Sequence, residues 1–304
     1  MSRTRLNLVA AGVSRLDFAP KPPFVAGTPG LITSLFVAFC SLLVPLISDS
    51  EELPAAKGRE IFKKYQASVI TVQLVVKSKM GFAGLGGDSR ESKQEVSGTV
   101  IDPSGLTVVS LSSTDPTSLL QSFMGSFGGD GEESFKLKMD SELSDVKLLG
   151  NDGTEIPAEI VLRDKDLDLA FVRPKAKLTT PFAAVDLTKS AKVDVFDEII
   201  TINRLGKVAG RAYAASVERI SAVVQKPRLF YVPGSDKSAT GLGCPAFTGD
   251  GKLVGIFVMR SIKSSGSGGM NPFSMQSNVA AILLPADDVK KVASQVPAAK
   301  EDQK

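Results

Sequence analysis

The chain has 304 residues, and 43% of them are hydrophobic, enough for one large all-β domain or two smaller ones with a buried core. It contains no histidine, which excludes Ser-His-Asp and Cys-His catalytic sites, zinc sites with imidazole ligands and haem held by a proximal histidine. The formal net charge of +3 comes without a long Lys/Arg run, so nucleic acid is not an expected partner. Two cysteines, Cys40 and Cys244, are too few for a disulfide framework or a thiolate cluster, and we expect no metal and no cofactor.

The amino end carries the features of an export segment. Residues 1–30 are basic, poor in acids and interrupted by prolines, and we expect them to be a disordered leader. Leu31 to Ile47 is uncharged and mostly apolar, and the acidic sequence SDSEEL follows it. Positive charge before and acidic charge after predict a segment whose amino end stays in the cytoplasm. Residues 31–48 are therefore expected to be a signal peptide or a membrane anchor, with a buried core helix as the alternative. The protein is expected in the periplasm or cell envelope, or anchored to the inner membrane.

Short β-branched segments separated by turn residues make up most of the remaining chain. We expect strands at Ser68–Lys77, Val96–Ile101, Leu106–Leu111, Asp145–Leu149, Glu155–Leu162, Leu167–Arg173, Glu198–Asn203, Ala212–Val224, Leu229–Val232, Leu253–Met259 and Ala280–Leu284. Many short strands without a long helical period favour antiparallel barrels or a sandwich.

Helices and loops complete this prediction. Amphipathic patterns predict short helices at Ala55–Gln66 and Asp287–Val296. Segments rich in Gly and Ser predict loops at Ser78–Gln94, Thr114–Glu142 and Ser261–Asn278. Apolar side chains in the last two loops either anchor them to the domain or contact a partner.

Ser238 to Met259, SATGLGCPAFTGDGKLVGIFVM, has the outline of a protease active-site loop. A Gly-rich turn ends in Cys244-Pro245, and a second turn leads into an alternating apolar run. The outline resembles the GNSGGP segment of trypsin-like serine proteases (chymotrypsin/PA fold), in particular the HtrA (Deg) branch. Aligned on Pro245, the nucleophile position holds Leu242, and a leucine side chain cannot attack a carbonyl.

Further segments extend the resemblance to this family. Ser97–Leu106 (SGTVIDPSGL), Arg163–Val172 (RDKDLDLAFV) and Ala281–Pro285 (AILLP) are similar to segments of the HtrA protease domain, and they occur in the family's order. The resemblance covers roughly residues 57 to 296. It implies a domain at 55–296 with two antiparallel six-stranded β-barrels and a short C-terminal helix, followed by a disordered tail at 297–304.

The resemblance also implies a degenerate catalytic triad. It places the family's histidine at Ser112, its aspartate at Asp168 and its serine at Leu242. An aspartate without an imidazole to orient has no role in proton transfer. Asp168 is then either an acceptor for backbone N–H groups or a charge at a strand edge, and no catalytic residue is expected.

Cys244, Ser238 and Thr240 are the remaining candidates for a nucleophile near this loop. Cys244 has no histidine to lower its pKa and is expected to be a buried, inert thiol. The hydroxyls of Ser238 and Thr240 would need a desolvated lysine as base, and both candidates, Lys237 and Lys252, lie in polar turns.

The turn at Thr240, Gly241, Leu242, Gly243 and Cys244 remains a candidate substrate-binding loop of the oxyanion-hole kind. Glycines on both sides of Leu242 permit the backbone conformations that in the family point N–H groups at a substrate carbonyl. The sequence thus favours an inactive protease homologue that binds a peptide or protein outside the cytoplasm. The alternatives are an endopeptidase with an unconventional nucleophile and a structural β-domain unrelated to proteases.

Overall fold

The computed structural model describes residues 55–82, 85–115, 138–150, 152–234, 241–261 and 279–299. Within these ranges it describes the backbone alone for residues 78–82, 85–90, 138–141, 261, 279 and 280. All of these residues belong to one compact unit, Glu51–Lys304. The predicted leader at 1–30, the apolar segment at 31–48 and residues 300–304 of the predicted tail lie outside them. Within the described part of the chain, no helix is long and apolar enough to cross a membrane.

The first barrel is built from the amino-terminal half of the domain. Its strands are β1 (Val69–Phe82), β2 (Leu85–Val100), β3 (Thr107–Ser110), β4 (Lys138–Leu149), β5 (Glu155–Asp164) and β6 (Leu169–Pro174). They close antiparallel in the order β1-β2-β3-β6-β5-β4. Alternate residues of β1, among them Ile70, Val72 and Leu74, are fully buried and fill the interior, as the period of two requires.

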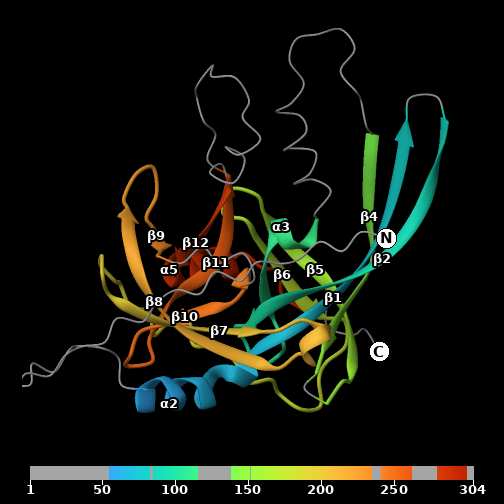
Figure 1. Ribbon diagram of the computed structural model, residues 1–304. Helices are drawn as coiled ribbons and strands as arrows, with labels where there is room; N and C mark the ends of the chain where they lie inside the picture. Colours follow the sequence, from blue (N-terminus) through green and yellow to red (C-terminus); the bar gives the residue numbers. More distant parts are fainter. Residues whose placement is uncertain are drawn as a thin grey trace, which may run out of the picture. The chain divides into compact units, whose positions relative to one another are not determined.

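The second barrel follows the same plan (Figure 1). Its strands are β7 (Glu198–Arg204), β8 (Tyr213–Val224), β9 (Phe230–Pro233), β10 (Pro245–Phe247), β11 (Leu253–Ser261) and β12 (Val279–Pro285), in the closed order β10-β11-β12-β9-β8-β7. Ile199, Ile220, Tyr231 and Phe257 pack together in a buried cluster of this barrel. The structure therefore confirms the predicted fold of two antiparallel six-stranded barrels.

Short helices lie at the ends of the domain. Helix α2 (Ala55–Tyr65) packs on the second barrel. The ring of Tyr65 stacks on that of Phe247 with their centroids 4.3 Å apart, and its hydroxyl donates to the carbonyl of Gly251 at 3.0 Å. A 3-10 turn, η2 (Gln66–Ser68), connects α2 to β1. The C-terminal helix α5 (Ala286–Ala293) buries Val289 and Val292 in a cluster that contains residues of both barrels. The predicted helices are thus present, each slightly shorter than expected.

The predicted loop at Ser78–Gln94 is wrong. These residues extend β1 and β2, which stay paired from Val69↔Thr99 as far as Met80↔Asp88. The polar sequence lacks the apolar alternation of a barrel strand, and pairing of the two backbones produces the ladder instead. The sequence also missed β10, which is only three residues long and is defined by its pairing with β7 and β11.

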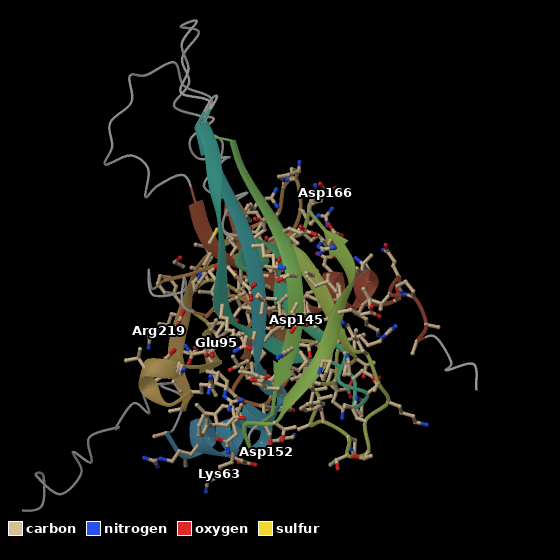
Figure 2. All side chains as sticks on the ribbon, turned by 90° about the vertical axis from the view of Figure 1, so that its right-hand side faces the viewer. Lys63, Glu95, Asp145, Asp152, Asp166 and Arg219 are labelled. Carbon is tan, nitrogen blue, oxygen red and sulfur yellow. The ribbon has the colours of Figure 1, made fainter. Side chains whose placement is uncertain are left out.

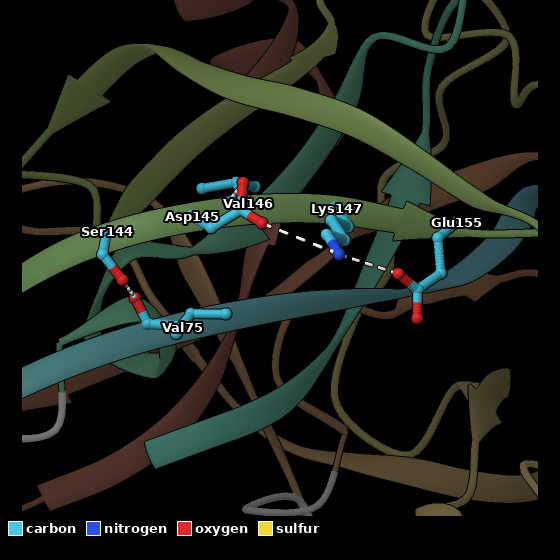
Figure 3. A network of polar contacts seen from close by, with 6 residues as sticks. All are labelled: Val75, Ser144, Asp145, Val146, Lys147 and Glu155. Carbon is cyan, nitrogen blue, oxygen red and sulfur yellow. Dashed lines mark hydrogen bonds and ion pairs between the residues drawn. The ribbon is translucent and has the colours of Figure 1, made fainter. Parts of the chain in front are cut away.

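The extended parts of β1, β2 and β4 form a three-stranded arm, which we define as residues 76–82, 85–95 and 138–144 (Figures 1 and 2). A β-bulge lies where the arm leaves the barrel, because Val75 pairs with Asp145 and Val76 with Leu143. The extra residue, Ser144, donates its hydroxyl to the carbonyl of Val75 at 3.0 Å (Figure 3).

Candidate functional site

The triad positions implied by the sequence all lie where the two barrels meet. Ser112 is in the short helix α3 (Leu111–Thr114), directly after β3, and Asp168 immediately precedes β6. Asp168 has a φ of 55°, a left-handed conformation that aspartate tolerates better than most residues. Its carbonyl accepts the N–H of Leu111 at 2.9 Å, which fixes α3 against this turn.

Both carboxylate oxygens of Asp168 accept hydrogen bonds. Oδ1 accepts the N–H of Ser112 at 2.7 Å. Oδ2 accepts both the hydroxyl of Ser110 at 2.5 Å and the N–H of Met259, from β11 of the second barrel, at 2.8 Å. With 8% of its surface exposed, Asp168 is a buried acceptor that links the two barrels. Each of its oxygens holds a neighbouring group in place, so the carboxylate has a structural role here.

Leu242 occupies a tight turn just before β10. The N–H of Cys244 donates to the carbonyl of Gly241 at 2.9 Å, which closes a β-turn with Leu242 and Gly243 at its centre. Gly243 has a φ of 80°, which suits glycine at the third position of such a turn. Leu242 is 9% exposed, so an apolar side chain is buried at the position that the sequence resemblance assigns to the nucleophile.

The same turn is held against the first barrel through Gly243. Its carbonyl accepts the hydroxyl of Thr99 at 2.7 Å, and its N–H donates to the carbonyl of Phe257 at 2.7 Å. A Cβ atom on Gly243 would lie 2.3 Å from the carbonyl oxygen of Ser97. The turn therefore sits between β2 of one barrel and β11 of the other, and its backbone has little freedom.

Sequence reasoning identified Asp168 and the turn but missed their partners. Ser97, Thr99, Ser110 and Met259 act through backbone atoms or through a single hydroxyl. Residues of these types are common in strands, and nothing in their spacing marks them. Only the folded arrangement of the two barrels brings them to the site.

The substitute nucleophiles are poorly placed where the structure describes them. Cys244 is 1% exposed, and burial raises the pKa of its thiol to about 12, although contacts with Ser97 and the backbone of Arg204 act in the opposite direction. The thiol is therefore protonated at neutral pH and shielded from solvent. The ammonium of Lys252 is paired with Asp250 at 2.7 Å in an exposed turn. Thr240, Ser238 and Lys237 lie outside the described residues.

Ionisable groups elsewhere in the described ranges do not assemble a metal site, since no group of three or more Asp, Glu or Cys ligands occurs there. Glu218 is notable because its Oε2 is buried without a hydrogen-bond partner, while Oε1 accepts the hydroxyl of Ser216 at 3.3 Å. Loss of hydration raises the pKa of this carboxyl. Glu218 pairs with the buried Ile199 across β7 and β8, so it stands beside the core of the second barrel.

A second link between the barrels is ionic. Arg211, which precedes β8, donates from Nε to Oε2 of Glu95 at 3.0 Å and from Nη2 to Oε1 at 2.6 Å. These hydrogen bonds lower the pKa of the Glu95 carboxyl. Ser97, in the same strand as Glu95, donates its hydroxyl to the carbonyl of Arg204 at 3.3 Å. The β7–β8 hairpin is thus fixed to β2 beside the candidate site.

Comparison with known proteins finds likeness among solved structures. No protein-family model matches the chain, and no curated protein matches it. Among solved structures, it is similar to the MamO protease domain from Magnetospirillum magneticum (apo form), with 15% identity, 78% of this chain and 100% of that chain covered and a TM-score of 0.44. The two closed six-stranded barrels resemble the trypsin-like fold, and this resemblance rests on the strand topology.

Proposed function

We propose that this protein is a catalytically inactive, HtrA-type homologue of trypsin-like proteases that binds a peptide or protein segment in the cell envelope. The observation that carries the proposal is the carboxylate of Asp168. Its two oxygens accept three hydrogen bonds from Ser110, Ser112 and Met259, so the one retained triad residue serves the architecture. The chain has no histidine, and Leu242 stands at the nucleophile position.

The edge of β11 supports peptide binding. On this edge, the N–H of Phe257 donates to the carbonyl of Cys244, and its carbonyl accepts the N–H of Gly243. The N–H of Met259 points to the same side and donates to Asp168. Backbone groups alternate in direction along a strand, so the carbonyl of Met259 and both backbone groups of Ser261 face this edge too. No described strand pairs with β11 on that side beyond Phe257. An extended peptide can therefore add to β11 as a new strand.

Location in the envelope is proposed from the amino end. A basic stretch, an apolar stretch and an acidic stretch follow one another before the domain, which is the order expected of a segment that directs export. Membrane association through Leu31 to Ile47 would then keep the domain near the membrane.

The test uses the full chain in a mild detergent, with a fluorophosphonate probe and fluorescein-labelled denatured casein. We expect no covalent labelling and no cleavage, but a rise in fluorescence anisotropy as casein binds. Ser261→Pro removes an N–H that faces the open edge and leaves the β11–β12 ladder intact, so it should weaken binding. Asp166→Ala, an exposed change, is the matched control. Cleavage or labelling contradicts inactivity, and unchanged binding by Ser261→Pro contradicts the β11 edge as the binding site.

A further inference from the structure

The outer edge of β2 is open along the arm. β2 pairs with β3 only at Thr99 and Val100, and no described strand pairs with that side of β2 from Leu85 to Gly98. Its other side is bonded to β1. An edge of this length presents a row of backbone donors and acceptors to a further strand.

The backbone groups that face this edge can be assigned from the barrel. The N–H of Ile101 donates to the carbonyl of Leu106 at 2.8 Å, and Thr99 pairs with Val108, so these residues direct their backbone groups toward β3. The β1–β2 register is regular from Thr99 to Asp88, so every second residue keeps this direction. Within the arm, Ser89, Glu91, Lys93 and Glu95 therefore present their N–H and carbonyl groups to the open edge.

The charges along this edge favour a register centred on Ser92, because Glu95, which would face Lys93 in a register centred on Gln94, is already paired with Arg211. Glu91 and Lys93 are both exposed and lie on the same face of the strand. In a two-fold antiparallel pair of identical strands, centring on Glu91 would place two carboxylates opposite each other, and centring on Lys93 two ammonium groups. Centring on Ser92 places Glu91 of each copy opposite Lys93 of the other, with residues of matching hydrogen-bond direction facing each other.

We propose that two copies of this chain associate through β2, antiparallel and edge to edge, about a two-fold axis at Ser92. The two arms then form one continuous six-stranded sheet, with two Glu91–Lys93 pairs beside the axis. Moving the two-fold axis by one residue, to Glu91 or to Lys93, would place like charges opposite each other. The contact stays within the arm, because β2 pairs with β3 in the barrel at Thr99 and Val100.

Disulfide trapping tests the axis directly. In the proposed dimer, Ser92 of one copy lies opposite Ser92 of the other, in a pair that exchanges no backbone hydrogen bonds. The two Cα atoms of such a pair lie about 4.5 Å apart, a distance that a disulfide can bridge. In a Cys40→Ser background of the full chain, Ser92→Cys should yield a covalent dimer on mild oxidation. Lys207→Cys, at an exposed position on another hairpin, should remain monomeric on a non-reducing gel. A failure of Ser92→Cys to cross-link, equal cross-linking by both variants, or cross-linking of Ser92→Cys to a different protein overturns the proposal.

Charge exchange tests the register. Glu91→Lys and Lys93→Glu each turn two attractive pairs into repulsive ones and should raise the dimer dissociation constant by about tenfold, measured by sedimentation velocity of the full chain in detergent. The double exchange restores opposite charges and should return the constant to within about threefold of the original. Single and double variants that all dimerise equally would place the contact elsewhere, and a double variant weaker than both singles would exclude this register. Peptide binding at β11 involves neither residue, so the two proposals fail independently.

Discussion

The N–H of Met259 in β11 lies 2.8 Å from Oδ2 of Asp168, so a backbone group of the second barrel is bound by a carboxylate of the first. The same carboxylate holds Ser110 and Ser112 in its own barrel. The resemblance to trypsin-like proteases would give this aspartate the role of orienting a histidine. Here it joins strands that come from opposite halves of the domain, and this gives a physical reason for an aspartate at this position in a chain without histidine.

Asp168→Ala should destabilise the domain strongly. The change leaves the N–H groups of Ser112 and Met259 without their buried acceptor, and we expect a loss of about 3 kcal/mol in the free energy of unfolding. Urea denaturation followed by circular dichroism measures it. Asp166→Ala, two residues away and exposed, should change stability by less than about 0.5 kcal/mol. Equal effects of the two substitutions would show that the carboxylate is not a structural link.

Gly243→Ala should be far more harmful than Gly241→Ala. At Gly243 a methyl group would lie 2.3 Å from the carbonyl oxygen of Ser97, and the φ of 80° is strained for alanine. We expect a loss of about 3 kcal/mol or more. At Gly241 no atom of the described residues, apart from its chain neighbours, lies within 4 Å of the added methyl group, and the φ is not in the left-handed region. Thermal unfolding of the two variants side by side provides the comparison, and a stable Gly243→Ala protein would contradict the close approach of the turn to β2.

Glu218→Gln should stabilise the domain at neutral pH. Burial raises the pKa of this carboxyl above its ordinary value of 4.5, so the folded state binds the proton more tightly than the unfolded state does. Stability contributed by the protonated form is thus present below pH 4.5 and is lost as the pH rises through the folded pKa. Glu218→Gln should therefore raise the free energy of unfolding at pH 7, and this increase should disappear at acid pH. Denaturation curves at several pH values test this, and a gain that does not depend on pH would assign the effect to packing instead.

Tyr65 should anchor helix α2 mainly through its ring. Tyr65→Phe removes the hydrogen bond to Gly251 and should cost about 1 kcal/mol. Tyr65→Ala also removes the stacking on Phe247 and should cost about 3 kcal/mol. Lys63→Ala, on the exposed face of the same helix (Figure 2), is the control and should have little effect. If the phenylalanine and alanine variants were equally unstable, the hydroxyl and not the ring would be the anchor.

Most of the barrel strands could be predicted from the sequence because they are short runs of β-branched and other apolar residues bounded by turn residues. The β1 segment from Val69 to Val76 and the run from Leu253 to Met259 are examples, and both pack into barrel cores. The arm could not be predicted in this way. Its strands between Ser78 and Gln94 are polar, and their pairing depends on backbone hydrogen bonds, which carry no signature of side-chain type.

The sequence by itself determined that no histidine-dependent chemistry is available, because a residue type absent from the chain cannot be supplied by any fold. It also indicated a β-rich domain, a barrel or a sandwich, through its short apolar runs and turn residues, and the resemblance to trypsin-like proteases implied two barrels. Only the tertiary structure decided what Asp168, Gly243 and the edge of β2 do. Their roles rest on contacts between residues far apart in sequence, such as Asp168 with Met259 and Gly243 with Ser97, and on which strand edges remain unpaired once the barrels close.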